Sequence, residues 1–202
     1  MSKILNLAIV ILFSLTLILY AKGSGKVERL SFTQEDLPEI TNPETFLPWM
    51  NLEKMIEVLK DVKHIKYKRG SLIEKKNSFK YSTILSKLEV KEEQHSVVFT
   101  NLMITENDTM QYSQNYKDKM SEAYNYFFPR KDMMFYRFVG VESIEVPAGK
   151  FECTVLEGFD DEKKVKYWMI NDKPGIFAKI IEEGEGCFGE LEYFVYELEE
   201  IK

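Results

Sequence analysis

The stretch VESIEVPAGKFECTVLEGF, residues 141–159, decides the fold. Apolar and polar residues alternate on both sides of Val146-Pro147-Ala148-Gly149, as in strands with one face against a core. Pro followed two residues later by Gly suits a type I turn closed by a left-handed glycine. The stretch therefore predicts a hairpin of two antiparallel strands.

The same pattern continues to the C-terminus. Turn-forming residues recur at 160–163, at Lys173-Pro174-Gly175-Ile176 and at 184–189. They separate strands expected at about 136–146, 150–159, 164–171, 175–183 and 190–200, which form a five-strand antiparallel meander. If Phe159 faces Lys164 across the second hairpin, Trp168 lies opposite Val155 on a buried face.

Upstream of the meander, the apolar residues first recur at the spacing of a helix and then, further along the chain, at the shorter spacing of strands. Apolar residues at helical spacing predict a helix over about 51–62, with Asn51 as its N-cap. Strands at 79–85 and 97–105, joined by a charged turn at 89–94, are expected to pair. A second helix is expected at 116–127, before Pro129.

These elements define one α+β domain at 45–202. We expect a curled, half-barrel-like antiparallel sheet of roughly eight strands with two helices packed on it. Residues 24–44 carry two prolines and no sustained periodicity, so they are interpreted as an extended lead-in.

Residues 1–23 have the order of a secretory signal peptide. A basic start with Lys3 precedes an apolar run over 4–20, and Ala21-Lys22-Gly23 offers small residues for cleavage. The alternative is an uncleaved membrane anchor, because the run is nearly long enough to span a bilayer. No cysteine lies near the end of the run, so a lipobox lipoprotein is not expected. Export to the periplasm or beyond the cell, with no membrane span after cleavage, is the prediction.

The charge balance narrows the range of partners. The net charge is −6 and becomes more negative if the leader, with its two lysines, is removed. This disfavours nucleic acid and anionic lipid surfaces, which attract basic proteins. The oligomeric state is left open.

The hairpin carries a resemblance to known proteins. The segment 139–151, which contains Val146-Pro147-Ala148-Gly149-Lys150-Phe151, resembles the VPAG-x-F signature of uncharacterised exported bacterial proteins, including TapB-like domains. As in those proteins, an aromatic strand with Tyr167-Trp168 follows, and then a turn at Gly175. More loosely, the plan is similar to the half-barrels of LolA- and LolB-type lipoprotein carriers. The resemblance implies a fold and a compartment, and carries over no catalytic residue.

No catalytic constellation is visible in the sequence. His64 and His95 stand outside any metal-ligand spacing, and no G-x-S-x-G elbow or phosphate-binding glycine loop occurs. Acidic clusters at 160–162 and at Glu182-Glu183 lack the spacing of a calcium loop. The prediction is therefore no enzyme, no metal and no cofactor. A hydrolase would need a convergent acid, base and nucleophile.

Two cysteines in an exported chain suggest a disulfide. The meander, however, places Cys153 near one end of the sheet and Cys187 in a turn at the opposite end. One strand spans more than about 20 Å, whereas disulfide geometry needs Cα atoms within about 7 Å. Two free thiols are expected, with Cys153 buried and Cys187 more accessible.

The segment 110–138 is unusually rich in methionine and aromatic residues, which line apolar pockets in many proteins. We hypothesise an apolar cavity between this segment and the sheet, bordered by Tyr124, Phe127, Phe128, Met134 and Phe135. The predicted function is a non-enzymatic protein that binds or carries an apolar, lipid-like ligand. The alternative is a structural or interaction protein of the cell envelope, in which these residues only fill the core.

Overall fold

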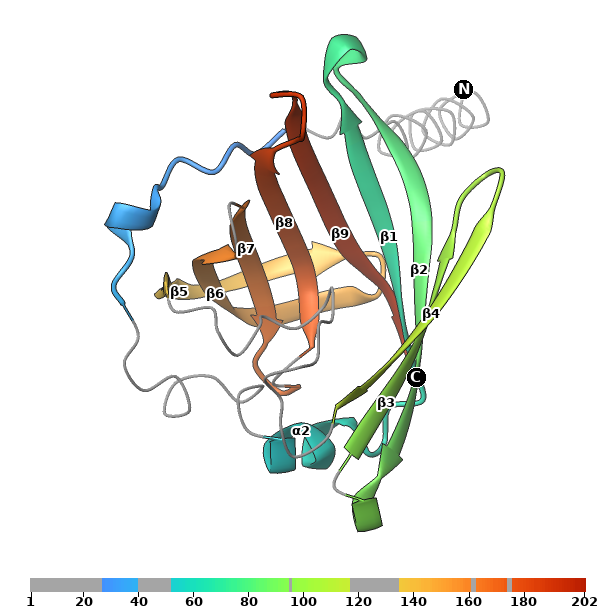
Figure 1. Ribbon diagram of the computed structural model, residues 1–202. Helices are drawn as coiled ribbons and strands as arrows, with labels where there is room; N and C mark the ends of the chain where they lie inside the picture. The colour runs from blue at the N-terminus through green and yellow to red at the C-terminus, as the bar shows by residue number, and fades with distance from the viewer. Residues whose placement is uncertain (1–26, 40–51, 95, 117–134, 161–162, 174–175) are drawn as a thin grey trace, which may run out of the picture.

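The structure is a computed structural model that describes residues 27–39, 52–94, 96–116, 135–160, 163–173 and 176–202 (Figure 1). The predicted signal peptide at 1–23 lies outside the described residues. In the described part of the chain, no helix combines the length and apolar character needed to cross a membrane.

Strands dominate the described residues. One α-helix, α2 (Leu52–Leu59), and three short 3₁₀ turns, η1 (Gln34–Asp36), η4 (Glu74–Lys76) and η5 (Glu92–Gln94), accompany them. The nine strands are β1 (His64–Ile73), β2 (Ser78–Lys91), β3 (Ser96–Ile104), β4 (Thr109–Tyr116), β5 (Phe135–Val146), β6 (Gly149–Asp160), β7 (Lys163–Ile170), β8 (Phe177–Glu185) and β9 (Leu191–Ile201).

All nine strands belong to one open antiparallel sheet, in the order β4-β3-β2-β1-β9-β8-β7-β6-β5. The chain enters the sheet at its centre with β1 and proceeds outward to the edge strand β4. It then starts again at the opposite edge with β5 and returns to the centre, where β9 pairs with β1. The sheet is thus two meanders joined at the β1–β9 pair.

The sheet is strongly curled. The amide of Ala148, in the turn between β5 and β6, donates a hydrogen bond to the carbonyl of Leu198 in β9, although β7 and β8 separate β6 from β9 in the sheet order. Figure 1 shows the β5–β6 hairpin running across the direction of β8 and β9. The expected half-barrel form is consistent with this arrangement.

Both faces of the sheet are buried at the end of β7, which explains the continuous apolar run there. Tyr167, Trp168, Met169 and Ile170 are all buried, although successive side chains point to opposite faces. We name the two faces after Trp168 and Tyr67. The Tyr67 face carries the larger part of the core, including Tyr196, Ile180 and Leu198.

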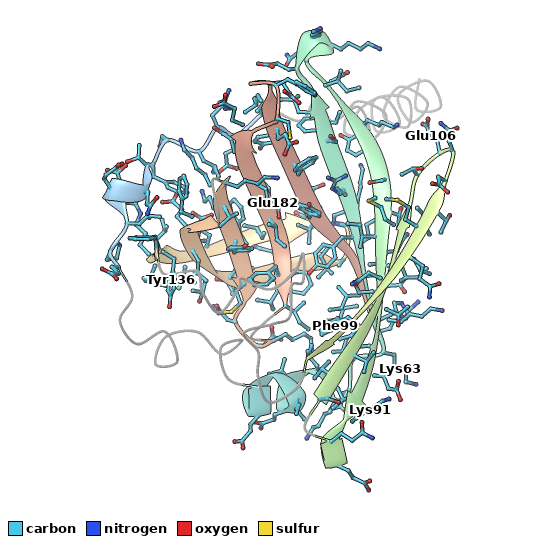
Figure 2. The ribbon with its side chains drawn as sticks, in the orientation of Figure 1. Lys63, Lys91, Phe99, Glu106, Tyr136 and Glu182 are labelled. Atoms are coloured by element: carbon cyan, nitrogen blue, oxygen red, sulfur yellow. The ribbon has the colours of Figure 1, made fainter. Side chains whose placement is uncertain are left out.

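Charged side chains lie at both ends of the β2–β4 part of the sheet. Figure 2 labels Glu106 in the turn between β3 and β4, and Lys91 at the far end of β2. Helix α2 lies against β2 and β3, with Leu59 fully buried.

The predicted meander is confirmed, with strand ends within two residues of those expected. Its register is also confirmed: Phe159 pairs with Lys164, Val155 pairs with Trp168, and Trp168 is buried. The β5–β6 turn differs in detail, since Val146 pairs directly with Gly149 and leaves a two-residue loop. Gly149 has a positive φ of 135°, outside the left-handed helical region.

Other expectations need correction. The prediction of two helices is wrong for the described residues, which hold only α2: Tyr116, where the second helix should begin, ends β4, and 117–127 lies outside the described residues. Residues 64–73 form a full strand that the sequence pattern does not predict. Much of the expected turn at 89–94 is also strand, because β2 extends to Lys91 and only η5 separates it from β3.

Candidate functional site

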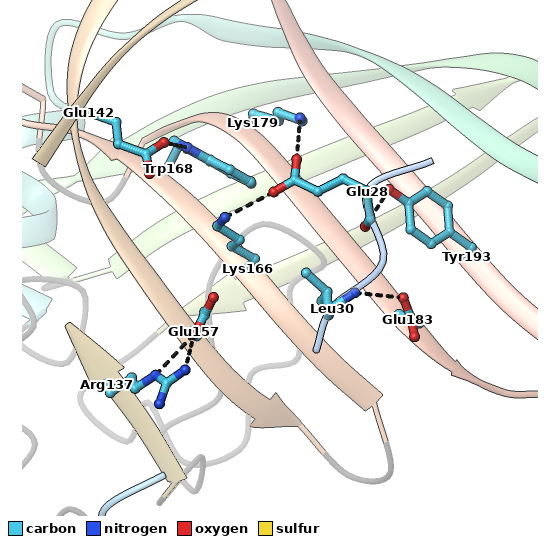
Figure 3. Close-up of polar contacts among 10 residues, drawn as sticks. All are labelled: Glu28, Leu30, Arg137, Glu142, Glu157, Lys166, Trp168, Lys179, Glu183 and Tyr193. Atoms are coloured by element: carbon cyan, nitrogen blue, oxygen red, sulfur yellow. Dashed lines mark hydrogen bonds and ion pairs between the residues drawn. The ribbon is translucent and has the colours of Figure 1, made fainter. Parts of the chain in front are cut away.

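An extended stretch of chain lies on the Trp168 face of the sheet. Residues 27–39, called here the covering segment, are held there largely by side chains of the sheet that bond to its backbone. The amide of Leu30 donates to the carboxylate of Glu183 at 3.0 Å, and the carbonyl of Leu30 accepts from Lys164 Nζ at 3.1 Å. The Tyr193 hydroxyl donates to the carbonyl of Glu28 at 3.2 Å (Figure 3).

The covering segment also buries apolar side chains. Leu30, Phe32 and Leu37 are 5%, 3% and 6% exposed, respectively. The guanidinium of Arg137 lies 5.9 Å from the centre of the Phe32 ring, and Arg137 also donates to the carbonyl of Asp36. The segment therefore supplies the apolar cover that the Trp168 face would otherwise lack.

Trp168 is the centre of this face. Its Nε1 donates to Glu142 at 2.9 Å, and the ammonium groups of Lys166 and Lys179 lie 4.6 Å and 4.8 Å from the centre of the ring. Lys166 precedes Trp168 by two positions on β7, and Lys179 on β8 pairs with Trp168. All three side chains therefore share one face of the sheet. A cation above an aromatic ring is stabilised by the ring quadrupole, so this arrangement holds both lysines over the indole.

The carboxylate of Glu28 bridges the two lysines. Its Oε1 lies 2.9 Å from Lys166 Nζ and its Oε2 lies 3.3 Å from Lys179 Nζ (Figure 3). Partial burial opposes ionisation of this carboxyl, but the hydrogen bond from Lys166 and the charge of Lys179 together lower the pKa of Glu28. The lysine side chains are only 14% and 24% exposed, so they form a partly desolvated site for one negatively charged group.

Two further carboxylates of the Trp168 face are satisfied by arginines. Glu183 accepts from Nε and Nη2 of Arg29, both at 3.0 Å, in addition to the Leu30 amide. Glu157 accepts from Arg137 at 2.7 Å and 3.0 Å. The Arg29–Glu183 pair joins the covering segment to β8, whereas the Arg137–Glu157 pair lies within the sheet. Both carboxylates are thus paired elsewhere, and Glu28 bridges Lys166 and Lys179.

A polar cavity of about 440 Å³ opens beside the covering segment, where β8 turns into β9. Its charged lining residues are Arg29, Glu74, Lys164, Glu183, Glu185 and Glu190. This cavity is not the apolar one expected from the sequence. The hairpin beyond it carries Phe188, which is 95% exposed.

The hypothesised apolar cavity is only partly within the described residues. Tyr124, Phe127, Phe128 and Met134 lie outside them, so their prediction stays open. Phe135 begins β5, half-buried, and pairs with Phe159 and, through an isolated bridge, with Glu39 of the covering segment. Phe135 therefore shares the Trp168 face with the covering segment.

The neighbouring residue Tyr136 lies on the Tyr67 face and is buried. Its hydroxyl has no hydrogen-bond partner among the described residues, and burial raises the pKa of Tyr136 to about 12. Asn101 Nδ2, on the same face, is likewise buried without a partner in the described part of the chain.

The histidines and cysteines of the described residues are separated in the fold. His64 is hydrogen-bonded to Glu200 at the start of β1, and three strands lie between β1 and the strand of Cys153. His95 lies outside the described residues. Cys153 is buried and Cys187 exposed, as predicted, and both are free thiols. Burial raises the pKa of Cys153 to about 11, so this thiol is protonated at neutral pH.

No sequence pattern singled out the cluster of Trp168, Lys166, Lys179 and Glu28. One signal is present in the sequence: Lys166 lies two positions before Trp168 on a predicted strand, so both side chains are expected on the same buried face. An inward-pointing lysine in a central strand needs a carboxylate partner, and this need directs attention to the covering segment.

No protein-family model matches the chain, and no curated protein matches it. The VPAG-x-F resemblance therefore stays a prediction.

Solved structures give weak similarities. A protein of Bacteroides fragilis, provisionally named as exported with a YmcC-like fold, is 13% identical, with a TM-score of 0.38 over 69% of this chain and 94% of that one. A provisionally named lipoprotein of Parabacteroides distasonis is 13% identical, with a TM-score of 0.37 over 69% and 95%. A domain from Vibrio parahaemolyticus, provisionally named an outer membrane lipoprotein-sorting protein, is 10% identical, with a TM-score of 0.22 over 75% and 93%. All three scores lie below 0.5, too low for these similarities to indicate the function of this chain.

Proposed function

We propose that this chain is an exported, non-enzymatic protein that binds an apolar, lipid-like molecule. The order of residues 1–23 supports export, because a basic start, an apolar run and small residues at a cleavage site follow one another. The binding function is supported by the Trp168 face of the sheet.

The observation that carries the proposal is the nature of what covers this face. An extended chain segment, not a helix or a second sheet, buries Leu30, Phe32 and Leu37 on it. A surface that accepts three apolar side chains from an extended chain has the shape and polarity to accept an apolar chain of another molecule. Few backbone ladder bonds hold the segment. Within residues 27–39, the ladder contact with the sheet is the isolated bridge between Glu39 and Phe135.

A second candidate is a structural or interaction protein with a filled core. The Tyr67 face favours it, because Tyr67, Tyr196, Ile180 and Leu198 are fully buried against their neighbours. In that case the covering segment is a permanent part of the core, and no apolar molecule enters.

The test is binding by the intact, exported protein. Protein purified from its native compartment under mild conditions is extracted with organic solvent, and the extract is analysed by mass spectrometry for stoichiometric lipid. In parallel, a long-chain fatty acid with an anthroyloxy fluorophore is titrated into delipidated protein, and saturable binding at or below tens of micromolar is expected. The absence of both co-purified lipid and saturable probe binding would favour the structural alternative.

A further inference from the structure

The covering segment resembles an amphiphile in the way it sits on the sheet. Its Glu28 carboxylate lies between Lys166 and Lys179 on the Trp168 ring, and its Leu30 and Phe32 side chains are buried further along the same face. A charged group at one end and apolar groups along the length are the two parts of a fatty-acid-like molecule. The segment therefore marks out a site with a head-group position and a position for an apolar chain.

The way the segment is attached allows it to leave. Three side chains of the sheet, from Glu183, Lys164 and Tyr193, bond to the backbone of Glu28 and Leu30. Removing the segment leaves the strand ladder from β5 to β9 intact, because none of those ladder bonds involves residues 27–38. A segment that is held by few backbone ladder bonds can open locally without unfolding of the whole domain.

We propose that Lys166, Lys179 and Trp168 form the head-group site for an amphiphile with a single anionic group, such as a long-chain carboxylate, and that residues 27–37 occupy this site until the amphiphile displaces them. This inference rests on the proposed function and names the ligand chemistry and the site for it. The head group takes the place of the Glu28 carboxylate, and the apolar chain takes the place of Leu30 and Phe32.

The charges around the site require an anion. The two ammonium groups are 14% and 24% exposed beneath the segment. When an amphiphile replaces the segment, its apolar chain keeps this face covered, and two buried charges without the Glu28 counter-charge would be strongly unfavourable. A neutral or cationic head group would leave that cost in place. Glu142 remains bonded to the Trp168 indole and Glu157 remains paired with Arg137, so neither carboxylate is available to the two lysines. Glu183 loses Arg29 when the segment leaves, but it lies opposite Lys164 in the β7–β8 pair. One negative charge between Lys166 and Lys179 therefore takes the place of Glu28.

The test compares two probes that differ only in charge. An anthroyloxy-labelled long-chain fatty acid and its methyl ester are titrated into the full mature protein and into variants. The double variant Lys166→Met/Lys179→Met should bind the acid at least ~10-fold more weakly, because a charge-assisted hydrogen-bonding pair is lost, and should bind the ester as before. Glu28→Gln should bind the acid roughly three- to tenfold more tightly, because the competing carboxylate is gone.

The matched control is Lys66→Met. Lys66 lies on β1, away from the covering segment, and is also an ion-paired lysine of the sheet. Its Nζ lies 2.9 Å from the carboxylate of Glu199 on β9. Its replacement should change the affinity for neither probe.

A measurement on the unaltered protein guards against misfolded variants. The Leu30 amide is bonded to Glu183, so displacement of the segment by the fatty acid should speed hydrogen exchange in residues 27–39. Strands β6 to β9 should stay as protected as before.

The outcomes separate the two proposals. Saturable binding of the acid that is insensitive to the lysine and Glu28 changes, without faster exchange in 27–39, overturns the head-group site and leaves the proposed function standing. No binding of either probe, by the unaltered protein or by Glu28→Gln, overturns both. Acid-specific weakening in the double variant, with faster exchange in the unaltered protein, supports both.

Discussion

Replacement of Trp168 by alanine tests the register of the meander and the role of the Trp168 face together. The indole is 3% exposed and lies opposite Val155. Truncating a fully buried tryptophan to alanine removes its transfer free energy and leaves a cavity, which costs about 3–5 kcal/mol. Loss of two cation–π contacts, from Lys166 and Lys179, adds about 1 kcal/mol.

The expected destabilisation is therefore about 4–6 kcal/mol. With a urea m-value of about 2.5 kcal/mol/M for a chain of this size, the unfolding midpoint should fall by roughly 1.6–2.4 M. Far-ultraviolet circular dichroism is the appropriate signal, because the substitution removes an intrinsic fluorophore. Phe188→Ala is the control: Phe188 is 95% exposed, so its midpoint should move by less than about 0.3 M. If Trp168→Ala behaves like Phe188→Ala, the burial of this face and the argument built on it are wrong.

Three further predictions concern single groups. Tyr67→Phe should lower the free energy of unfolding by about 1–2 kcal/mol, because the buried Tyr67 hydroxyl donates to the Phe177 carbonyl at 2.7 Å. Tyr136→Phe should be neutral or slightly stabilising, because the Tyr136 hydroxyl is buried without a partner among the described residues. Equal losses of stability in urea unfolding would contradict this difference. Thiol titration with a colorimetric disulfide reagent should find one fast thiol, Cys187, in native protein and two in unreduced, denatured protein; a count of zero after denaturation would disprove the free thiols. Because the folded state lowers the pKa of Glu28 from its ordinary value of 4.5, the stability it contributes is present above that pH and is lost as pH falls through the lower folded value. Glu28→Gln should thus reduce the loss of stability below pH 4.5 relative to the unaltered protein, and identical acid profiles would show that the Glu28 pair is not formed in solution.

The parts of the fold that the sequence predicts are those set by local chemistry. Pro147 and Gly149 fix a turn, and strict alternation on either side fixes which residues share a face, so the sequence alone places Val155 opposite Trp168. The helix expected at 51–62 follows from apolar spacing in the same way and is found over the shorter range Leu52–Leu59, while its expected N-cap, Asn51, lies outside the described residues. β1 escapes prediction because His64–Ile73 mixes charged residues with apolar ones, and its pairing with β9 depends on residues far away in the sequence.

The candidate site could not be predicted for the same reason. Glu28 lies 138 residues before Lys166 and 151 before Lys179, and an extended segment without hydrophobic periodicity gives no signal of where it docks. The methionine- and aromatic-rich segment stands out by composition, yet most of its candidate residues lie outside the described residues. The charged cluster consists of one glutamate and two lysines, which are common residues that stand out only when the fold brings them together.

The charges on the Trp168 face allow stability and recognition to be separated. A partly buried ion pair contributes little to stability compared with apolar groups of similar size, because desolvation offsets the attraction. If Glu28, Lys166 and Lys179 served only to hold the covering segment, replacing all three by methionine should be neutral or should stabilise the fold by about 1–2 kcal/mol, with no other consequence. If they form a head-group site, the triple variant should keep that stability but bind the labelled fatty acid no better than its methyl ester. Urea unfolding and the two titrations on one preparation distinguish these cases. Unchanged stability with an unchanged preference for the acid over the ester would assign the cluster to holding the segment, whereas unchanged stability with lost charge discrimination would assign it to binding.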